Sequence, residues 1–410
     1  MDLIEPVKPV KDPIKICHIT TVDMTLRFLL MNQLANLQEA GYEVVGISSP
    51  GPEIPFIEGA GIRHIAVPMT RRFFTPLADL RTLCSLYRIF RQEKFTIIHT
   101  HTPKAGIYGR LAAKFARVPI VIHTHHGFPV REKSIGGLVF RYMEKIAGQL
   151  SDLIFSINQE DIEVCTKNGI WPSSKVTLCG QGGIGIDLNR FNPKRISRDC
   201  VATKCSEIGL PDGAKVVGFV GRLVREKGLL ELLAAARIVH MKIPEIHFLI
   251  IGATDNGKGD ALTREVAQQY NISNICHFTG LRQDMPELYA LMDLFVLPSH
   301  REGFGLVLAE AAAMGVPVIA TDIKGCREAA ENGRNGLLVP VGDVKVLADA
   351  IIELLTDREK ARRMGEEGRR IAMDRFDERL VFKKVKEEYR RLLREKGLPL
   401  PALETISQMR

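Results

Sequence analysis

Short apolar runs alternate with helical stretches twice along this chain, and this alternation most limits how it can fold. The first series of predicted strands lies at 14–19, 44–47, 62–67, 95–99, 119–123, 153–157 and 176–178, and the second lies at 215–220, 247–251, 275–278, 293–297, 316–320 and 336–339. Because strands joined through helices pair in parallel and are covered on both faces, the sequence predicts two doubly wound α/β domains.

The length of the chain also favours two domains, because 410 residues with 45% hydrophobic content can bury two cores. We expect an N-terminal domain at 14–190 and a C-terminal domain at 214–375, joined by a linker at 191–213 that is rich in turn-forming and charged residues. A polar, proline-containing leader occupies 1–13, and a last helix lies within 376–410.

The sequence has no pattern typical of a membrane-spanning, secreted or disulfide-bonded protein. No segment reaches the ~18–20 apolar residues that cross a bilayer, and the leader does not have the charged and then apolar pattern of a secretion signal. The eight cysteines include no Cys-x-x-Cys pair, so we expect reduced thiols that are mainly structural. These observations predict a cytoplasmic protein.

Positive charge is concentrated in the first half of the chain. Residues 1–200 contain 25 Lys and Arg against 18 Asp and Glu, which accounts for +7 of the net +8. Within 71–94, apolar residues at helical spacing alternate with arginines, a pattern typical of an amphipathic helix on an anionic membrane or of a surface helix whose apolar stripe is core. We expect a peripheral position at the inner face of the membrane, with Phe73 and Phe74 projecting. No base-reading motif accompanies the charge, which argues against nucleic acid.

A glycine-rich turn between an apolar strand and a helix predicts an anion site. The stretch from Ser299 to Glu310 reads Ser-His-Arg-Glu-Gly-Phe-Gly-Leu-Val-Leu-Ala-Glu and follows the predicted strand at 293–297. Backbone N–H groups around Phe304, Gly305 and Leu306 are expected to be unpaired donors at the positive end of a helix dipole. Gly303 and Gly305 would let a phosphate approach the main chain closely.

Two carboxylates and two cations complete this predicted site. Glu310 lies about one turn inside the helix, where it can accept hydrogen bonds from both hydroxyls of a ribose, and Glu302 precedes the helix and can face a sugar. Alone, such glutamates are more often solvated first-turn residues. Arg222 and Lys227, however, follow another apolar strand, and open α/β sheets bind ligands at the carboxyl ends of their strands. The set predicts a sugar-nucleotide site whose cations bind a diphosphate.

These segments together resemble the retaining glycosyltransferases of family 4, which have the two-domain GT-B fold. Glu302 and Glu310 match the Glu-x7-Glu signature, and the stretch from Gly221 to Gly228 looks like the family's diphosphate-binding loop. The resemblance continues through 311–321, 325–328 and 335–340 and covers most of the chain. It implies that the two domains face a cleft and that the last helix crosses back to pack on the N-terminal domain.

The resemblance also implies roles in the first domain. His126 belongs to a stretch similar to the family's His-Thr-x-His-Gly, in which the second histidine contacts the donor sugar. Thr21, Asp23 and Arg27 lie in or just after a loop where the family commonly has Gly-Gly. A similar Thr-Thr-Val-Asp loop occurs in the subgroup that makes capsular polysaccharide, exopolysaccharide and lipid-linked oligosaccharides. We expect these three residues and Lys104 to contact the acceptor.

Other polar residues of the first domain have more than one interpretation. Lys104 starts a predicted helix and Arg110 lies two turns further on, so each is either a ligand for an acceptor diphosphate or a helix-surface charge. His99 and His101 are two positions apart on a predicted strand, so they point to the same side, and His123 and His125 are spaced in the same way. Two histidines at this spacing can bind a zinc ion. No carboxylate or cysteine is placed with them, so hydrogen-bonded histidines are preferred and no metal site is predicted.

The resemblance implies transfer with retention of anomeric configuration. The leaving phosphate oxygen takes the acceptor's proton on the same face of the sugar, and the alternative is a covalent intermediate on Glu302. Arg222, Lys227 and the amides of the glycine turn are expected to stabilise the leaving group. No Asp-x-Asp motif is present, so no metal cofactor is expected. The subgroup favours a UDP-linked hexose or N-acetylhexosamine as donor and a polyprenyl-diphosphate-linked or other glycan as acceptor.

Three other functions fit parts of the pattern. A sugar-nucleotide epimerase of the same architecture needs no acceptor, and a non-catalytic nucleotide-sugar-binding module releases no nucleotide. A nicotinamide-dependent oxidoreductase also has doubly wound sheets, but no Gly-x-Gly-x-x-Gly follows the first strand.

Overall fold

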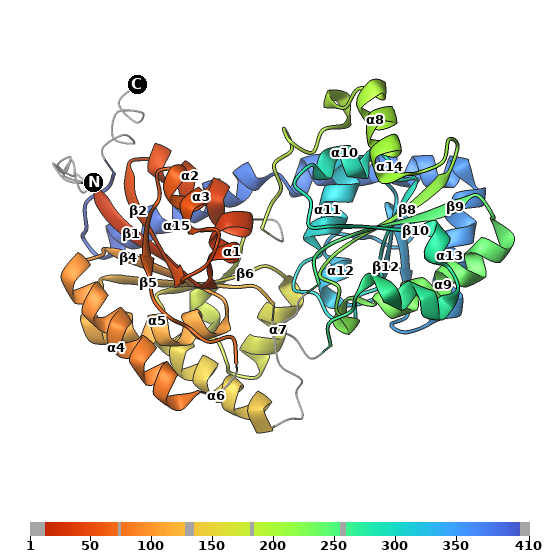
Figure 1. Cartoon of the computed structure of the whole chain (residues 1–410). Helices are drawn as coiled ribbons and strands as arrows, with labels where there is room; N and C mark the ends of the chain where they lie inside the picture. The colour runs from red at the N-terminus through yellow and green to blue at the C-terminus, as the bar shows by residue number, and fades with distance from the viewer. Residues whose placement is uncertain (1–12, 73–74, 128–134, 181–183, 255–259, 402–410) are drawn as a thin grey trace. The chain divides into compact units, whose positions relative to one another are not determined.

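The computed structural model describes residues 13–72, 75–127, 135–180, 184–254 and 260–401, and its contacts divide the chain into two compact units. The first unit consists of Met1–Gln181 with Arg379–Arg410, and the second consists of Gly182–Glu378. Each unit contains a sheet covered by helices (Figure 1). Phe73, Phe74 and all but the last residue of the predicted leader lie outside the described residues.

The first unit contains a seven-stranded parallel sheet in the order β3-β2-β1-β4-β5-β6-β7. Its strands are β1 (Ile14–Val22), β2 (Tyr42–Ser49), β3 (Arg63–Ala66), β4 (Ile97–His101), β5 (Ile120–His125), β6 (Leu153–Ser156) and β7 (Val176–Leu178). Strand β1 pairs with β2 on one side and with β4 on the other, so the order reverses between β1 and β4. The loops after these two strands therefore meet at a topological switch point, where α/β sheets bind ligands.

Helices cover both faces of this sheet. The π-helix η1, α2 and α15 pack on one face, and α4 and α5 pack on the other. The helices of the unit are α1 (Asp23–Thr25), η1 (Leu26–Leu30), α2 (Met31–Glu39), α3 (Ile54–Gly59), α4 (Pro76–Glu93), α5 (Pro103–Ala116), α6 (Ile135–Leu150), α7 (Gln159–Lys167), η2 (Ser173–Lys175) and α15 (Glu378–Glu395). The parallel, doubly covered sheet confirms the predicted fold class for this half.

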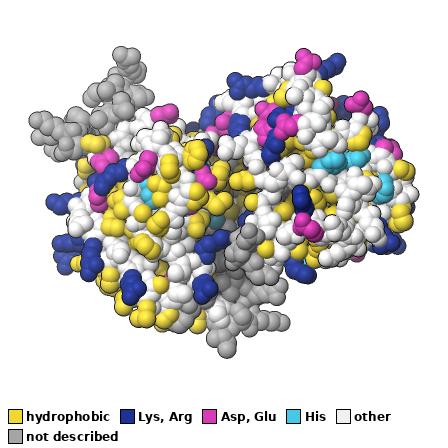
Figure 2. Space-filling view, viewed as in Figure 1, with side chains coloured by type: hydrophobic (Ala, Val, Ile, Leu, Met, Phe, Trp, Pro, Cys, Tyr) yellow, Lys and Arg dark blue, Asp and Glu magenta, His cyan; other side chains and the backbone are white. Residues whose placement is uncertain are grey.

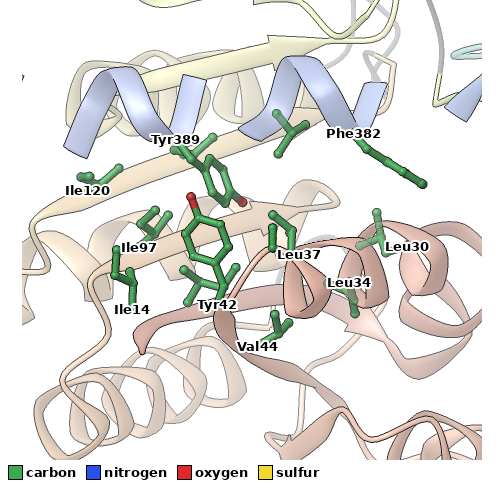
Figure 3. Packing of buried hydrophobic residues seen from close by; sticks show 14 of the residues in the cluster. Ile14, Leu30, Leu34, Leu37, Tyr42, Val44, Ile97, Ile120, Phe382 and Tyr389 are labelled. Carbon is green, nitrogen blue, oxygen red and sulfur yellow. The ribbon is translucent and has the colours of Figure 1, made fainter. Parts of the chain in front are cut away.

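Helix α15 follows the second unit in sequence but packs in the core of the first. Its buried residues Val381, Val385 and Tyr389 recur at helical spacing and form one apolar stripe. The ring of Tyr389 meets that of Tyr42 from β2 edge to face, with ring centroids 6.0 Å apart (Figure 3). The core of the first unit therefore includes residues that follow the second unit in sequence.

The second unit contains a six-stranded parallel sheet in the order β10-β9-β8-β11-β12-β13. Its strands are β8 (Lys215–Val220), β9 (Ile246–Ile251), β10 (Cys276–Gly280), β11 (Leu294–Leu297), β12 (Val318–Thr321) and β13 (Gly336–Val339). The central strands are nearly continuous apolar runs that are buried along their length, as expected when both faces of a parallel sheet are covered.

Two packed pairs of helices, α9 with α13 and α11 with α14, accompany this sheet. The helices are η3 (Pro193–Arg195), α8 (Arg198–Ile208), η4 (Arg225–Lys227), α9 (Leu229–Lys242), η5 (Arg264–Tyr270), η6 (Ser273–Ile275), α10 (Met285–Tyr289), α11 (Leu306–Ala313), α12 (Lys324–Arg327), α13 (Val344–Thr356) and α14 (Arg358–Arg375). Helix α8 lies in the segment for which the sequence predicts a linker, and Ser197 caps its first turn by accepting from the Cys200 amide.

Arg110 corrects the sequence interpretation of helix α5. It is neither a helix-surface charge nor a ligand at a binding site, because its side chain is fully buried. Its guanidinium donates to both oxygens of Glu144 on α6 at 2.9 and 2.6 Å, and the indole of Trp171 donates to the same carboxylate at 3.2 Å. The ion pair links α5 to α6. Ile107 of α5 also packs against Phe140 and Ala147 of α6.

The surface of the first unit combines basic and apolar side chains (Figure 2). On α4, Leu86 and Phe90 are core residues, whereas Leu77 and Leu80 are 75% and 57% exposed. The apolar stripe of this helix is thus partly core and partly surface. Among the described residues, no helix combines the length and apolar character needed to cross a bilayer.

Replacement of Glu144 by Gln is predicted to destabilise the first unit by about 3–5 kcal/mol, because it leaves the buried Arg110 charge without its partner. The measurement is urea unfolding followed by circular dichroism and by the fluorescence of Trp171, the chain's single tryptophan. The control is Glu359→Gln, which breaks an exposed pair with Arg362 and is expected to leave the unfolding midpoint nearly unchanged. Equal unfolding midpoints for the two variants would contradict this account.

Candidate active site

In the second unit, the loops after β8 and β11 leave adjacent strands at the switch point of the sheet. Strand β8 pairs with β9 on one side and with β11 on the other, so strand order reverses between β8 and β11. The first loop contains Gly221, Arg222 and the short helix η4, and the second runs from Pro298 to Gly305. The predicted cations and the predicted glycine turn therefore belong to neighbouring strands, as the sequence interpretation requires.

Close backbone contacts connect these two loops. Gly228 ends η4 with φ 73°, and a side chain there would place its Cβ 1.9 Å from the carbonyl oxygen of Pro298. Only glycine permits both this left-handed conformation and this approach. The amide of His300 donates to the carbonyl of Glu226 at 2.9 Å. The basic loop is thus held against the start of the loop that follows β11.

Lys227 and Glu302 form an ion pair between the two loops. The Nζ of Lys227 lies 2.5 Å from Oε1 of Glu302, and the side chains are only 17% and 11% exposed. Ser299 donates to the same oxygen at 2.8 Å. Gly325 allows this arrangement, because a Cβ there would lie 2.4 Å from the carbonyl oxygen of Glu302. The carboxylate orients the lysine, so Glu302 has a positioning task that the sequence did not indicate.

The amides at the start of α11 differ in part from the prediction. Gly305 donates to the carbonyl of Gly325 at 2.9 Å, and Leu306 donates to the carbonyl of Phe304, also at 2.9 Å. The prediction that these two amides are unpaired is therefore wrong. The glycine at 305 also has a packing reason, since a Cβ there would lie 2.6 Å from Leu308. The positive end of the α11 dipole remains at this turn, but a phosphate would have to compete for these two amides.

The remaining predicted donor-site residues lie in the loops after β8 and β11. Arg222 is exposed directly after β8, and Gly221 before it is half-buried. Gly303 is half-buried, whereas Phe304 is buried with its ring edge to face against Phe376, at 5.6 Å between centroids. Phe304 therefore stabilises the turn through its side chain.

Glu310 lies on α11 and has an unusual protonation equilibrium. The hydroxyl of Tyr289 donates to its Oε2 at 2.9 Å and to the carbonyl of Val307 at 3.2 Å. Burial raises the pKa of Glu310 from 4.5 to about 7, although the Tyr289 hydrogen bond and Arg190 oppose the shift. The carboxyl group is consequently poised between its neutral and ionised forms near neutral pH. No sequence pattern indicated a role for Tyr289, which lies 21 positions away on α10.

In the first unit, the loops after β1 and β4 are joined by two threonines. The Thr21 amide donates to the Thr102 hydroxyl at 3.1 Å, and the two hydroxyls lie 2.8 Å apart. Asp23 is buried and accepts from the amides of Met24 and Glu53 at 2.9 and 2.7 Å. Asp23 therefore holds the loop after β2, a structural task that the sequence did not indicate.

The two cations predicted to contact an acceptor have different surroundings. The guanidinium of Arg27 on η1 lies 5.7 Å from the ring centroids of both Phe28 and Phe56, which are exposed. Lys104 at the start of α5 lies 2.6 Å from Asp79 of α4 and is largely buried. Burial raises the pKa of Asp79, but hydrogen bonds from Lys104 and Thr75 outweigh it and the pKa is lowered overall. Lys104 thus joins α4 to α5 in the ligand-free structure.

His126 lies at the end of a chain of buried histidines. Its Nε2 is 3.1 Å from Nδ1 of His101, and Nε2 of His101 is 3.0 Å from Nδ1 of His18. Among the described residues, His18, His99 and His101 are the group of potential ligands close enough for a metal ion, with ligand atoms within 4.8 Å of one another. Their ring nitrogens, however, have hydrogen-bond partners. His18 belongs to a different strand, so the sequence spacing could not reveal it.

Comparison with known sequence families identifies both halves of the chain. The family described as "Glycosyl transferases group 1" matches residues 203–371, and the one described as "Glycosyl transferase 4-like domain" matches residues 29–179. The first match contains the loops after β8 and β11, and the second contains the loop after β4 and His126.

Three known proteins illustrate the similarity. The capsular polysaccharide biosynthesis glycosyltransferase CapM of Staphylococcus aureus is 31% identical over 385 residues, which cover 93% of this chain and 98% of CapM. The UDP-Gal:alpha-D-GlcNAc-diphosphoundecaprenol alpha-1,3-galactosyltransferase of Escherichia coli is 31% identical over 313 residues, covering 75% and 78%. The crystal structure of Anabaena Alr3699/HepE in complex with UDP and glucose superposes with a TM-score of 0.78 at 21% identity, covering 92% of this chain and 99% of that one.

Replacement of Tyr289 by Phe is predicted to raise the pKa of Glu310 above about 7, because the lost hydroxyl stabilises the ionised carboxylate. The measurement is a ¹³C NMR titration of glutamate carboxyl groups in the folded protein, with the Glu310→Gln spectrum identifying the resonance. The wild-type midpoint is expected near pH 7. A midpoint at the ordinary glutamate value, or one that is lower in Tyr289→Phe, would contradict the assignment.

Proposed function

Since the chain belongs to the group 1 glycosyltransferases of family 4, has the GT-B fold and is a hexosyltransferase, we propose that it moves a hexose or N-acetylhexosamine from a UDP-sugar to a polyprenyl-diphosphate-linked glycan in surface polysaccharide synthesis. The names of the Staphylococcus and Escherichia relatives, which refer to capsular polysaccharide and to a diphosphoundecaprenol acceptor, support this choice. Transfer with retention of anomeric configuration is part of the proposal.

The observation that carries the proposal is the Lys227–Glu302 pair at the switch point of the second sheet. A diphosphate at this position receives the charge of Lys227 and, from the exposed end of β8, that of Arg222. As the bond to the sugar breaks, negative charge grows on the leaving diphosphate, so fixed cations stabilise the transition state more than the bound substrate. The ion pair with Glu302 holds Lys227 in position, which lowers the cost of reorganisation during the reaction.

Glu302 acts on Lys227 in this proposal, not on the sugar carbon. Its Oε1 already accepts from Lys227 and Ser299, and a carboxylate that is neutralised by two donors is a weak nucleophile. The account therefore favours departure of the diphosphate with transfer of the acceptor proton to it on the same face of the sugar. A covalent glycosyl–Glu302 intermediate is the alternative.

Glu310 binds the ribose of the donor nucleotide. Both diol hydroxyls donate to its carboxylate, which favours the ionised form of a group whose pKa burial raises to about 7. In the first unit, His126 contacts the donor sugar, and Thr21, Arg27 and Lys104 contact the acceptor. Asp23 contributes by holding the loop after β2 through the amide of Glu53.

A peripheral position at an anionic membrane completes the proposal. Leu77 and Leu80 of α4 are exposed, and Arg81 and Arg88 on the same helix are exposed as well. Apolar side chains that enter the headgroup region, together with arginines that pair with anionic lipids, suit a helix lying on a membrane surface. A polyprenyl-linked acceptor resides at that surface.

Replacement of Lys227 by Met is predicted to lower kcat/KM by about 10²–10³-fold, because one preorganised charge at the leaving group is lost. The measurement is UDP release and labelled lipid product from a panel of UDP-sugars with a polyprenyl-diphosphate-sugar acceptor. The control is Lys242→Met, which removes an exposed lysine from the far end of α9 and is expected to leave turnover unchanged.

Two results of this assay would contradict the proposed function. Conversion of the donor sugar without any acceptor would indicate an epimerase. Binding of UDP-sugars without release of UDP, in a folded protein supplied with the acceptor panel, would indicate a binding module. Full turnover by Lys227→Met would remove the leaving-group role of this lysine.

Membrane binding is predicted to depend on the exposed face of α4. The wild-type protein is expected to float with vesicles that contain phosphatidylglycerol and to stay in solution with pure phosphatidylcholine. Leu77→Asp with Leu80→Asp should abolish flotation, whereas Leu281→Asp, at an exposed leucine of the second unit, should not. Equal flotation of both variants would remove this face from the proposal.

A further inference from the structure

Three buried histidines of the first unit, His18, His99 and His101, belong to one continuous chain of hydrogen bonds that ends at the half-buried His126. After the His126–His101–His18 contacts, Nε2 of His18 lies 3.2 Å from the hydroxyl of Tyr389 on α15. That hydroxyl lies 2.6 Å from Nδ1 of His99, whose Nε2 lies 2.7 Å from the hydroxyl of Thr124. Five hydrogen bonds thus join six side chains from β1, β4, β5, α15 and the residue that follows β5.

The protonation state of the chain restricts how these bonds are arranged. Burial lowers the pKa of His18 and His126 to about 3, and burial also holds the pKa values of His99 and His101 well below 6.5. The rings are therefore neutral, with one N–H and one lone pair each. A neutral ring that uses both nitrogens must donate at one and accept at the other, so the direction of one bond determines the direction of the next.

The bond lengths at Tyr389 indicate which direction the chain takes. Hydrogen bonds from hydroxyl groups are shorter than those from N–H groups. The 2.6 Å contact fits a Tyr389 hydroxyl that donates to Nδ1 of His99, and the 3.2 Å contact fits an Nε2–H of His18 that donates to the tyrosine oxygen. It follows that His101 donates from Nε2 to His18, and that His126 donates from Nε2 to His101.

His126 is left with a free lone pair at the end of this chain. Its Nδ1 is buried and has no hydrogen-bond partner. In the arrangement just described, Nδ1 carries no proton, so it is an acceptor for a hydroxyl group and not a donor. A sugar hydroxyl is the ligand chemistry that this atom suits, because a buried acceptor without a partner costs free energy that binding of a hydroxyl would recover.

We propose that the hydroxyl of Tyr389 holds His126 in its Nε2–H form through His18 and His101, and so sets Nδ1 as the acceptor of a hydrogen bond from a substrate hydroxyl. Tyr389 is a positioning residue in this proposal, since it acts through other side chains. The inference deepens the proposed function, because it rests on His126 contacting the donor sugar. It connects the last helix of the chain to the chemistry of the first unit.

The alternative for these residues is a metal site. A zinc ion bound by His18, His99 and His101 would need all three lone pairs directed at one point at about 2.0–2.1 Å. Instead, His18 and His101 direct one nitrogen each at the other, 3.0 Å apart, and the tyrosine hydroxyl lies between His18 and His99. The hydrogen-bonded chain accounts for these contacts without an ion, and metal analysis decides between the two.

The test is Tyr389→Phe, which keeps the ring in the core but removes the hydroxyl. Its matched control is Tyr42→Phe, which removes another buried tyrosine hydroxyl from the same core, 6.0 Å away between ring centroids (Figure 3). Long-range ¹H–¹⁵N NMR of histidine-labelled protein reports the form of each ring, and the His126→Gln spectrum identifies His126. Thermal unfolding verifies that both tyrosine variants are folded.

The expected result is an Nε2–H form for His126 in the wild type and in Tyr42→Phe, and a mixture of forms in Tyr389→Phe. Turnover should fall in Tyr389→Phe by about 10–100-fold in kcat, as for outer-shell partners of functional histidines, with little change in the donor KM. An Nδ1–H form in the wild type, an unchanged spectrum in Tyr389→Phe, or one equivalent of zinc in the purified protein would overturn the hydrogen-bonded chain.

The spectra and the kinetics separate this inference from the proposed function. The spectra test the chain of hydrogen bonds even if the protein transfers no sugar from the donors tried. A changed His126 form with an unchanged kcat in an active enzyme would overturn the positioning role of Tyr389. Loss of activity with an unchanged spectrum would do the same, because the effect would then not pass through His126.

Discussion

The ion pair between Lys227 and Glu302 is the interaction on which the rest of the account depends. It is largely buried and joins loops that leave neighbouring strands where the strand order of the sheet reverses. Gly228 and Gly325 permit the close backbone approaches that this pair requires. A cation held near the positive end of α11 is what a departing diphosphate needs, and the parallel sheet places Lys227 there.

In the first unit, neutral side chains are held in position by hydrogen bonds. Burial keeps the histidines of this chain uncharged, and hydrogen bonds that run to Tyr389 determine which ring nitrogen of each carries the proton. Tyr389 completes this network from a helix that packs in the core of the first unit although it follows the second unit. Within the network, Nδ1 of His126 has no hydrogen-bond partner, and it belongs to the residue predicted to contact the sugar.

The sequence predicted the fold and the second site because both depend on local patterns. Alternating apolar runs and helices predict parallel sheets, and Lys227 and Glu302 lie in the loops that follow two such runs. Contacts between distant residues had no such signal: Glu144 lies 34 positions from Arg110, and Tyr389 lies 290 positions from His99. The amide of Gly305 was predicted to be free because its acceptor, the carbonyl of Gly325, belongs to another element.

The affinity ratio of UDP to uridine, measured by calorimetry in the wild type and in Lys227→Met, tests the central claim most directly. The ratio isolates the diphosphate, because both ligands share the nucleoside. The account predicts that the wild type prefers UDP strongly, and that Lys227→Met loses most of this preference while it binds uridine as before. Equal ratios in the two proteins would show that the diphosphate does not rest against Lys227.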